Sequence, residues 1–179
     1  MKKLLLLLCF VFIHLVVYPV YFKHLGMSDG LSQVSVMSIY QDCLGRMWFG
    51  TREGVSIYDG ERMRVYKGWE NLDPKSSINV LLGHECDHLT GNRQGDIFFR
   101  TCDSLVRYDI REEKFCVVSG CKAKTITSAD GDIWTGYDDM VCRYDEKGDS
   151  LQLYAKTNTP GISSLLISGK KIWIGTYEG

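Results

Sequence analysis

The hydrophobic pattern of this chain is built from short apolar runs that recur along its length. Each run contains an aromatic residue and is too short for a helix, and its β-branched and aromatic residues favour a buried strand. The runs are Met47-Trp48-Phe49, Ile97-Phe98-Phe99, Ile133-Trp134 and Ile172-Trp173-Ile174. Gly and Asp turns lie between the strands, so the pattern predicts an all-β chain.

Further strands are expected on both sides of each run. A segment with alternating apolar and polar residues follows three of them, and this period of two indicates a strand with one buried face. These segments are 54–59, 105–109 and 140–145. Extended segments come before the runs at 34–40, 84–90, 124–128 and 162–167, and last strands are expected at 62–66, 115–118 and 151–154. No helical pattern is found after residue 25, so each unit is expected to be a four-stranded antiparallel sheet.

The units repeat one phrase. GRMWFGTREGVSIYD from Gly45, GDIFFRTCDSLVRYD from Gly95 and GDIWTGYDDMVCRYD from Gly131 align without a gap, and KKIWIGTYEG from Lys170 begins a fourth copy. Self-similarity at a period of about 40 residues, with four strands in each unit, is typical of β-propeller blades. The sequence therefore predicts a partial β-propeller of about three and a half four-stranded antiparallel blades.

Two positions of the phrase have an expected structural role as repeat anchors. The aromatic residues are expected to fill the space between neighbouring blades, and the glycines after them to stand where a side chain would collide with the next blade. The aromatic anchors are Trp48, Phe98, Trp134 and Trp173, and the glycines are Gly50, Gly136 and Gly175. Arg100 replaces the glycine in the second unit, so we expect an altered corner there.

The beginning of the chain has the pattern of an export signal. Lys2 and Lys3 precede an apolar run from Leu4 to Val17, which indicates a signal peptide or an uncleaved anchor. The predicted divisions are the signal segment 1–20, a closing outer strand and lead-in 21–30, blade 1 at 31–67, a connection 68–83, blade 2 at 84–118, blade 3 at 119–155, and half of blade 4 at 156–179. In a complete ring we expect 21–25 to join the last blade, and here to lack that partner.

Three phrases of the chain resemble a known family. WFGTREGVSIYDG and IWIGTYEG are similar to the two-component regulator propeller repeat, and FKHLGMSDGLSQVSVMSIYQD resembles the start of the periplasmic sensor region in hybrid two-component systems of gut Bacteroidetes. The resemblance covers roughly residues 22–179. It implies a longer parent with further propeller blades, a membrane helix and a histidine kinase. It also implies periplasmic sensing of glycan fragments and a homodimeric parent that is membrane-associated.

Composition narrows the possible partners. The formal net charge is −1, from 21 basic and 22 acidic residues, and no basic face is apparent, so nucleic acid is not an expected partner. After Cys9 is set aside, six cysteines remain, and they permit disulfides or act as small apolar fillers of the blades. The nearest candidates for a disulfide are Cys116 and Cys121.

One short string suggests a metal site. His84-Glu85-Cys86-Asp87-His88 spells the H-E-x-x-H motif, which binds zinc only on a helix, where both histidines lie on one face. On the strand expected here the two histidines would be about 13 Å apart, so we expect no metal and no zinc protease. The alternative is a strand face that presents His84, Cys86 and His88 together. We favour a polar inner strand that lines the channel mouth.

Catalytic constellations are not apparent in the sequence. Asp59, Asp109 and Asp145 recur at one repeat position, which indicates turn residues, and the tyrosines before them are expected to pack between blades. No cofactor is expected. The sequence thus predicts an exported, non-catalytic ligand-sensing or interaction propeller from a two-component sensor. The alternatives are an exported protein-interaction propeller without a kinase, and a propeller lyase or hydrolase.

Overall fold

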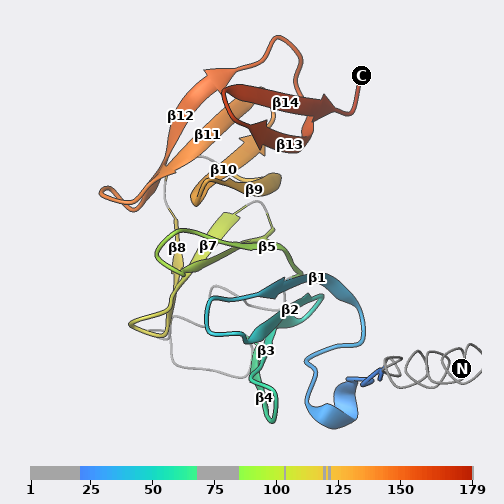
Figure 1. Ribbon diagram of the computed structural model, residues 1–179. Helices are drawn as coiled ribbons and strands as arrows, with labels where there is room; N and C mark the ends of the chain where they lie inside the picture. Colours follow the sequence, from blue (N-terminus) through green and yellow to red (C-terminus); the bar gives the residue numbers. More distant parts are fainter. Residues whose placement is uncertain (1–20, 68–84, 103, 119, 121, 179) are drawn as a thin grey trace, which may run out of the picture.

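The computed structural model describes residues 21–67, 85–102, 104–118, 120 and 122–178. The described residues are all-β apart from one 3-10 turn, η1 (Met27–Asp29). Figure 1 shows its strands in four successive sheets, blue at the N-terminal end and red at the C-terminal end. The predicted signal segment 1–20, the predicted connection 68–83 and His84 lie outside the described residues.

Three of the sheets are four-stranded antiparallel meanders, and the last has two strands. Blade 1 contains β1 (Val36–Gln41), β2 (Met47–Thr51), β3 (Gly54–Tyr58) and β4 (Met63–Tyr66). Blade 2 contains β5 (Cys86–Gly91), β6 (Ile97–Thr101), β7 (Ser104–Asp109) and β8 (Lys114–Val117). Blade 3 contains β9 (Thr125–Ala129), β10 (Asp132–Tyr137), β11 (Met140–Asp145) and β12 (Ser150–Lys156), and blade 4 is represented by β13 (Ile162–Ser168) and β14 (Lys171–Thr176). The prediction of a partial propeller is confirmed.

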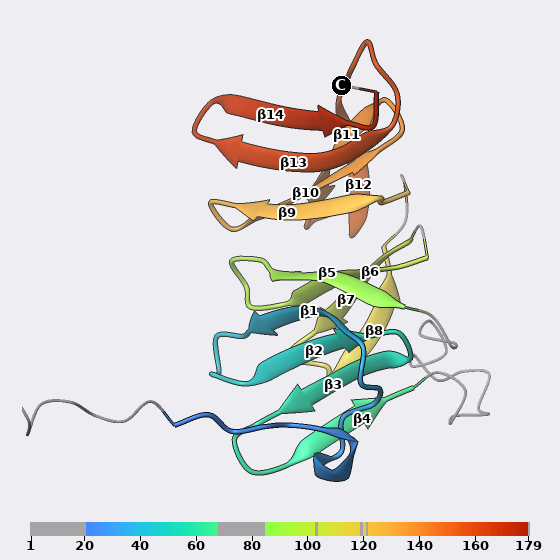
Figure 2. The same ribbon diagram turned by 90° about the vertical axis from the view of Figure 1, so that its right-hand side faces the viewer.

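The first strands of the blades form the inner edge of the array. β1 contacts β5, β5 contacts β9, and β9 contacts β13, so these strands follow one another in the stack of Figure 2. Hydroxyl groups link them across the blade boundaries. Ser38 Oγ accepts the Leu89 N–H at 2.9 Å, and Ser128 Oγ donates to the Gly91 carbonyl at 3.1 Å.

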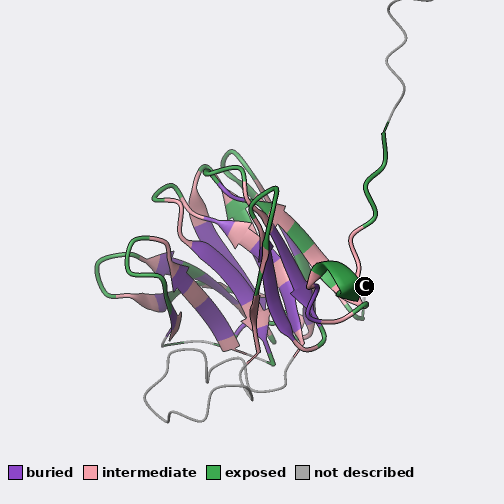
Figure 3. Cartoon of the chain, turned by 90° about the horizontal axis from the view of Figure 1, so that it is seen from below, coloured by how far each residue is buried: buried purple, intermediate pink, exposed green. Residues whose placement is uncertain are grey.

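The hydrophobic core lies between the blades, where neighbouring sheets pack face to face. Figure 3 shows the buried residues along the strands and the exposed ones in the turns. One cluster joins blades 1 and 2 around Trp48, a second joins blades 2 and 3 around Phe98, and a third joins blades 3 and 4 around Trp134. This arrangement explains why the apolar runs of blades 1 to 3 are short and mostly buried, whereas the run in β14 is half-buried or exposed.

Two of the repeat glycines lie where the blades approach most closely. A Cβ on Gly50 would overlap the carbonyl oxygen of Cys86 in blade 2. A Cβ on Gly136 would stand 2.6 Å from Ile162 Cγ2 in blade 4. At Gly175 it would meet Ser164 Oγ of the same sheet, since no following blade is present in the described residues.

The first hairpins of the blades differ in length. Trp48 pairs with Tyr40 in blade 1, eight positions back, whereas Trp134 pairs with Thr127 in blade 3, seven positions back. The shorter turn, Asp130-Gly131, has φ values of 52° and 81°, the conformation of a tight hairpin turn.

The lead-in before blade 1 differs from the expectation in one detail. No helix was expected after residue 25, but Met27–Asp29 forms a 3-10 turn. Its ends explain it: the Gly26 N–H donates to Asp29 Oδ2 at 2.9 Å, and Gly30 adopts φ 98°, which favours glycine. Residues 21–26 form no strand, and Tyr21 and Phe22 are exposed.

Candidate functional site

The seams between blades hold a repeated aromatic contact. The ring of Trp48 meets the ring of Tyr108 edge to face, with centroids 4.9 Å apart and planes at 65°. Phe98 meets Tyr144 in the same way, at 4.8 Å and 64°. In each pair the anchor is on the second strand of one blade and the tyrosine is on the third strand of the next. Tyr108 and Tyr144 are therefore packing residues, as the sequence predicts.

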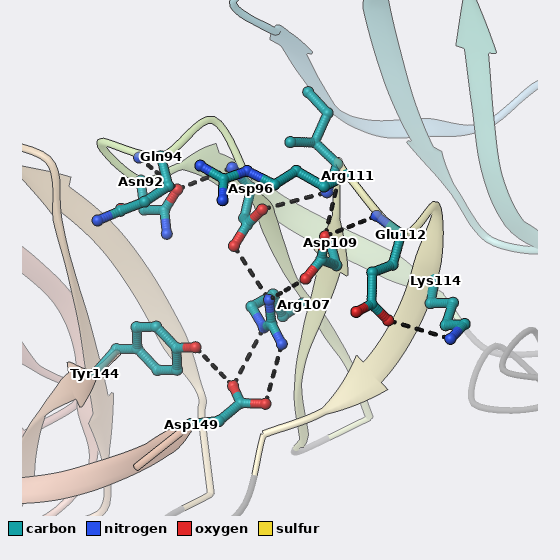
Figure 4. Close-up of polar contacts among 11 residues, drawn as sticks. Asn92, Gln94, Asp96, Arg107, Asp109, Arg111, Glu112, Lys114, Tyr144 and Asp149 are labelled. Atoms are coloured by element: carbon teal, nitrogen blue, oxygen red, sulfur yellow. Dashed lines mark hydrogen bonds and ion pairs between the residues drawn. The ribbon is translucent and has the colours of Figure 1, made fainter. Parts of the chain in front are cut away.

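An ionic contact accompanies the aromatic one between blades 2 and 3 (Figure 4). Arg107 on β7 donates to Asp96 at 3.1 Å, to Asp109 at 3.0 Å, and to both oxygens of Asp149 in the β11–β12 turn of blade 3. Tyr144 also donates its hydroxyl to Asp149 at 2.6 Å. The aromatic pair and the ionic cluster thus share one tyrosine.

The titration of this cluster follows from its burial and its charges. Burial alone would lower the pKa of the Arg107 guanidinium, but the hydrogen bonds and charge of Asp149 raise the pKa above its ordinary value. Burial, together with the hydrogen bond to Asp149, also raises the pKa of Tyr144. Both shifts favour the protonated forms of the two groups, which are the forms that donate to Asp149.

A weaker version of the cluster joins blades 1 and 2. Arg64 on β4 lies 3.8 Å from Glu113 in the β7–β8 turn, and both side chains are more than half exposed. Glu113 and Asp149 occupy equivalent places: each follows its tyrosine by five residues, and each has a positive φ, 52° and 45°. We call the aromatic pair and its accompanying arginine–acid pair the blade clasp.

Asp42 fixes the first aromatic anchor from within its own blade. Its buried carboxylate accepts the Leu44 and Arg46 backbone N–H groups at 2.9 Å, Arg46 Nε at 2.7 Å, and Trp48 Nε1 at 2.8 Å. Burial acts to raise the pKa of this carboxyl, but the Trp48 and Arg46 hydrogen bonds hold the pKa below its usual value. The sequence reasoning missed this residue. A signal was present, because Asn92 stands at the same place in blade 2 and caps its turn similarly.

The altered corner of blade 2 is an ion pair. Where other blades pair a serine or threonine with the repeat glycine, blade 2 pairs Asp87 with Arg100, whose Nε donates to Asp87 Oδ1 at 2.8 Å. His88 lies in a bulge of β5 with φ 53°, and its Nδ1 is 2.9 Å from Asp87 Oδ1. Burial acts to raise the pKa of Asp87, but His88 and Arg100 lower it below the usual value.

The candidate metal ligands are not presented together. Cys86 is fully buried against blade 1, and burial raises the pKa of its thiol to about 12, whereas His88 turns toward Asp87 at the partly exposed edge. His84 lies outside the described residues. In the part of the chain that the structure describes, no three His, Cys, Asp or Glu side chains form a metal-binding group.

The recurring aspartates hold turns. The Asp59 carboxylate accepts the N–H groups of Glu61 and Arg62 at 2.9 and 2.8 Å, and Asp109 accepts those of Arg111 and Glu112, both at 2.9 Å. These backbone hydrogen bonds lower the pKa of both carboxyls. The prediction that they are turn residues is confirmed.

Two hollows flank blade 3. The larger, about 400 Å³, runs from the β5–β6 turn over the end of β11 and β12, and among its lining residues are Arg143 and Tyr154. The smaller, about 280 Å³, lies at the other end of the blade, between blades 3 and 4. Its lining residues are Lys124, Tyr137, Asp138, Gly161, Ile162 and Tyr177.

The repeat anchors separate into buried and exposed members. Trp48 and Phe98 are fully buried and Trp134 is 7% exposed, whereas Trp173 is 59% exposed on the outer side of blade 4. The difference follows from position, because Trp173 faces away from blade 3 and no following blade covers it in the described residues. Leu166, its partner across the sheet, is 60% exposed.

Comparison with known proteins gives one sequence relative and several solved structures of similar fold. No protein-family model matches the sequence. Histidine kinase P4 of Formosa agariphila is 39% identical over 59 residues, which are 33% of this chain and 4% of that protein. The extracellular domain of a putative hybrid two-component system from B. thetaiotaomicron superposes with a TM-score of 0.74 and 24% identity, over 90% of this chain and 24% of that one. This likeness shows that the two chains share a fold.

A second fold neighbour is an enzyme. Virginiamycin B lyase of Staphylococcus aureus superposes with a TM-score of 0.57 and 16% identity, over 81% of this chain and 50% of that one.

This chain spans about a quarter of the solved sensor domain and a twenty-fifth of the kinase, since the covered shares are 24% and 4%. Within the described residues, no helix is long and apolar enough to cross a membrane.

Proposed function

We propose that this chain supplies blades to the exported, ligand-sensing propeller of a two-component sensor. The observation that carries the proposal is the superposition with an extracellular sensor domain over 90% of the chain. Local identity to a histidine kinase and the export signal at the N-terminus support the same assignment. In the parent protein the propeller would lie in the periplasm, and a membrane-spanning kinase, acting as a homodimer, would relay the signal.

The proposed ligand is a fragment of a glycan. The smaller hollow offers the chemistry of such a site, because it combines the rings of Tyr137 and Tyr177 with the polar groups of Lys124 and Asp138. Lys122 Nζ lies 5.4 Å from the centre of the Tyr137 ring and adds a donor beside it. Aromatic rings with adjacent donors and acceptors suit the apolar faces and hydroxyl groups of sugars.

The described charges favour binding over catalysis. Most of the buried and half-buried ionic groups are committed to structural partners, as Asp87 is to Arg100 and Asp42 is to Arg46. The likeness to the lyase is one of fold, so a lyase or hydrolase is the weaker alternative. A protein-interaction propeller without a kinase is the other alternative.

The gene and a binding measurement test the proposal together. Reading the gene past codon 179 is expected to reveal a membrane helix and a histidine kinase; an open reading frame with neither would favour the interaction propeller. The complete exported region is then titrated with a panel of neutral oligosaccharides by calorimetry.

The hollow itself is tested by two substitutions at one position. Tyr137→Ala is expected to weaken oligosaccharide binding about fivefold, since an aromatic contact contributes about 1 kcal/mol and a factor of ten in affinity corresponds to about 1.4 kcal/mol. Tyr137→Phe keeps the ring and is expected to bind normally. Equal binding by both variants would remove the glycan site from this hollow, and binding of no oligosaccharide would contradict the glycan assignment.

A further inference from the structure

The outer side of blade 3 repeats the groups that blade 2 uses to hold blade 3. Trp134 pairs with Arg143 across β10 and β11, as Phe98 pairs with Arg107 across β6 and β7. Arg143 Nη2 lies 2.7 Å from Asp132, which matches the contact of Arg107 with Asp96 in blade 2. Half of a blade clasp is therefore already assembled on this side.

The other half of that clasp is missing from the described residues. The Arg107 side chain is 15% exposed because Asp149 of the following blade covers it, whereas the Arg143 side chain is 48% exposed. The aromatic partner of Trp134 is Tyr154 of its own blade, at 4.8 Å, and the Tyr154 residue is 59% exposed. The guanidinium of Arg143 lies over the Trp134 ring, 5.6 Å from its centre.

The two complete clasps specify what would fit. In both, the incoming hairpin carries a tyrosine and an acid five residues later: Tyr108 with Glu113, and Tyr144 with Asp149. Blade 1 departs from this rule, because Met63 stands five residues after Tyr58. If blade 1 of a second copy packed against this side of the chain, it would offer no acid to Arg143. This disfavours a dimer formed through this surface.

The backbone also specifies a register. β14 pairs with β13 alone among the described strands, so its other edge is open for a third strand. Within blades 1 and 2 the tyrosine pairs with the residue before the anchor, Met47 with Tyr58 and Ile97 with Tyr108. In blade 4 the residue before the anchor is Ile172, so an incoming tyrosine belongs opposite Ile172.

We propose that Trp134, Arg143 and the open edge of β14 form a docking surface for an antiparallel β-hairpin with a tyrosine and, five residues later, an aspartate or glutamate. The hairpin is the continuation of this polypeptide in a longer form. Two observations favour the continuation of the polypeptide as the hairpin. The chain spans only 24% of the sensor domain that it resembles. In addition, the tyrosine that completes each clasp comes from the next blade of the same chain at both complete blade boundaries.

The repeat allows a direct test by extension of the chain. Gly175-Thr176-Tyr177-Glu178-Gly179 aligns with Gly50-Thr51-Arg52-Glu53-Gly54, after which blade 1 continues with Val55. A copy of residues 141–156, with Cys142→Ser, is therefore fused directly after Gly179, which gives the hairpin a high effective concentration at its docking surface. A matched extension copies residues 55–66 of blade 1, which carry the tyrosine but Met63 in place of the acid.

The first extension is expected to raise the thermal unfolding midpoint of the chain by about 4 °C or more, and the blade 1 extension by clearly less. Arg143→Gln, or Asp149→Asn in the copied segment alone, should remove most of the difference between the two extensions. Combining Arg143→Glu with Asp149→Arg in the copied segment should restore the difference in midpoint between the two extensions. Such a recovery would not be possible if the single substitutions acted by unfolding the chain.

Three results would overturn the proposal. They are no rise in the midpoint with the first extension, an equal rise with the blade 1 extension, and no response to the charge substitutions.

Sedimentation velocity of the unextended chain tests separately whether a second copy binds at this surface. A dimer that dissociates on Arg143→Gln would show that a second copy, and not the continuation of the polypeptide, takes this surface. None of these outcomes depends on the glycan assignment, so the two proposals can fail separately.

Discussion

At the scale of single residues, Asp42 has the most demanding position in the described chain. Its carboxylate is buried and takes four hydrogen bonds, two from the backbone of its turn and two from the Arg46 and Trp48 side chains. Hydrogen bonds to a charged group contribute more than those between neutral groups, and a buried donor left unpaired is costly. One acid thus connects the shape of a turn with the orientation of an aromatic anchor.

Asp42→Asn is expected to lower the free energy of unfolding by about 2 kcal/mol at neutral pH. The amide keeps one oxygen for the turn, as Asn92 does in blade 2, but turns an NH₂ toward the donors of Arg46 and Trp48. Urea unfolding measures the change. Asp59→Asn, on an exposed turn that makes only backbone contacts, is the matched control and should change stability by well under half as much.

The stabilising contribution of Asp42 is also expected to depend on pH in the acid range. Because the folded state holds the pKa of Asp42 below its ordinary value, its contribution is complete above the unfolded pKa of about 4 and is lost as the pH falls through the lower folded pKa. The stability difference between wild type and Asp42→Asn should therefore shrink below about pH 4. A difference that stays constant down to pH 2 would show that the carboxylate charge is not what matters.

At the scale of elements, close approach between strands decides which repeat positions tolerate a side chain. Gly50 faces the backbone of Cys86 in the next blade, and backbone cannot move aside as a side chain can. Gly175 occupies the same repeat position, but an added Cβ there would overlap with Ser164 Oγ alone, which can rotate away. Chemically identical substitutions at the two positions should therefore have different costs.

Gly50→Ala is expected to destabilise the chain by about 1–3 kcal/mol, the usual cost of overpacking a well-filled interface. Gly175→Ala should cost less than about 1 kcal/mol, because no following blade packs against this position in the described residues. Thermal and urea unfolding of both variants make the comparison. Equal losses of unfolding free energy at the two positions would mean that the cost reflects the strand propensity of the residue and not close contact between blades.

The elements show where prediction from sequence succeeds and where it ends. The strands around Trp48, Phe98 and Trp134 could be predicted because local periodicity and repeat alignment both report on them. The clasp of Arg107 with Asp149 could not, since the two residues are far apart in the sequence and only the packing of two blades brings them together. His88 is a third case: a bulge with positive φ re-aims its side chain, which a regular strand pattern cannot anticipate.

At the scale of the whole molecule, the array has two open ends. The stability of repeat arrays comes largely from contacts between neighbouring units, and here only three such seams exist among the described sheets. Trp173 and Leu166 project from the last sheet, and exposed apolar patches of this kind promote association. The chain by itself is therefore expected to be marginally stable and to self-associate.

Trp173→Ser together with Leu166→Ser is expected to reduce this association while leaving the unfolding midpoint nearly unchanged, because both side chains already face solvent. Sedimentation velocity over a range of concentrations measures the first effect and calorimetry the second. Leu44→Ser, at an exposed turn residue of blade 1, is the control. A monomeric wild type with cooperative unfolding would contradict the expectation.

The blade clasp also bears on how such a protein lengthens during evolution. The anchor of a repeat contacts the following blade and its tyrosine contacts the preceding one, so each unit carries the two complementary halves of a boundary. Duplicating one unit of about 40 residues in the gene inserts a blade that satisfies both of its neighbours without any compensating substitution. A unit like blade 1, whose tyrosine lacks the acid five residues later, would supply no acid to an arginine of the preceding blade if it were placed in the middle of an array.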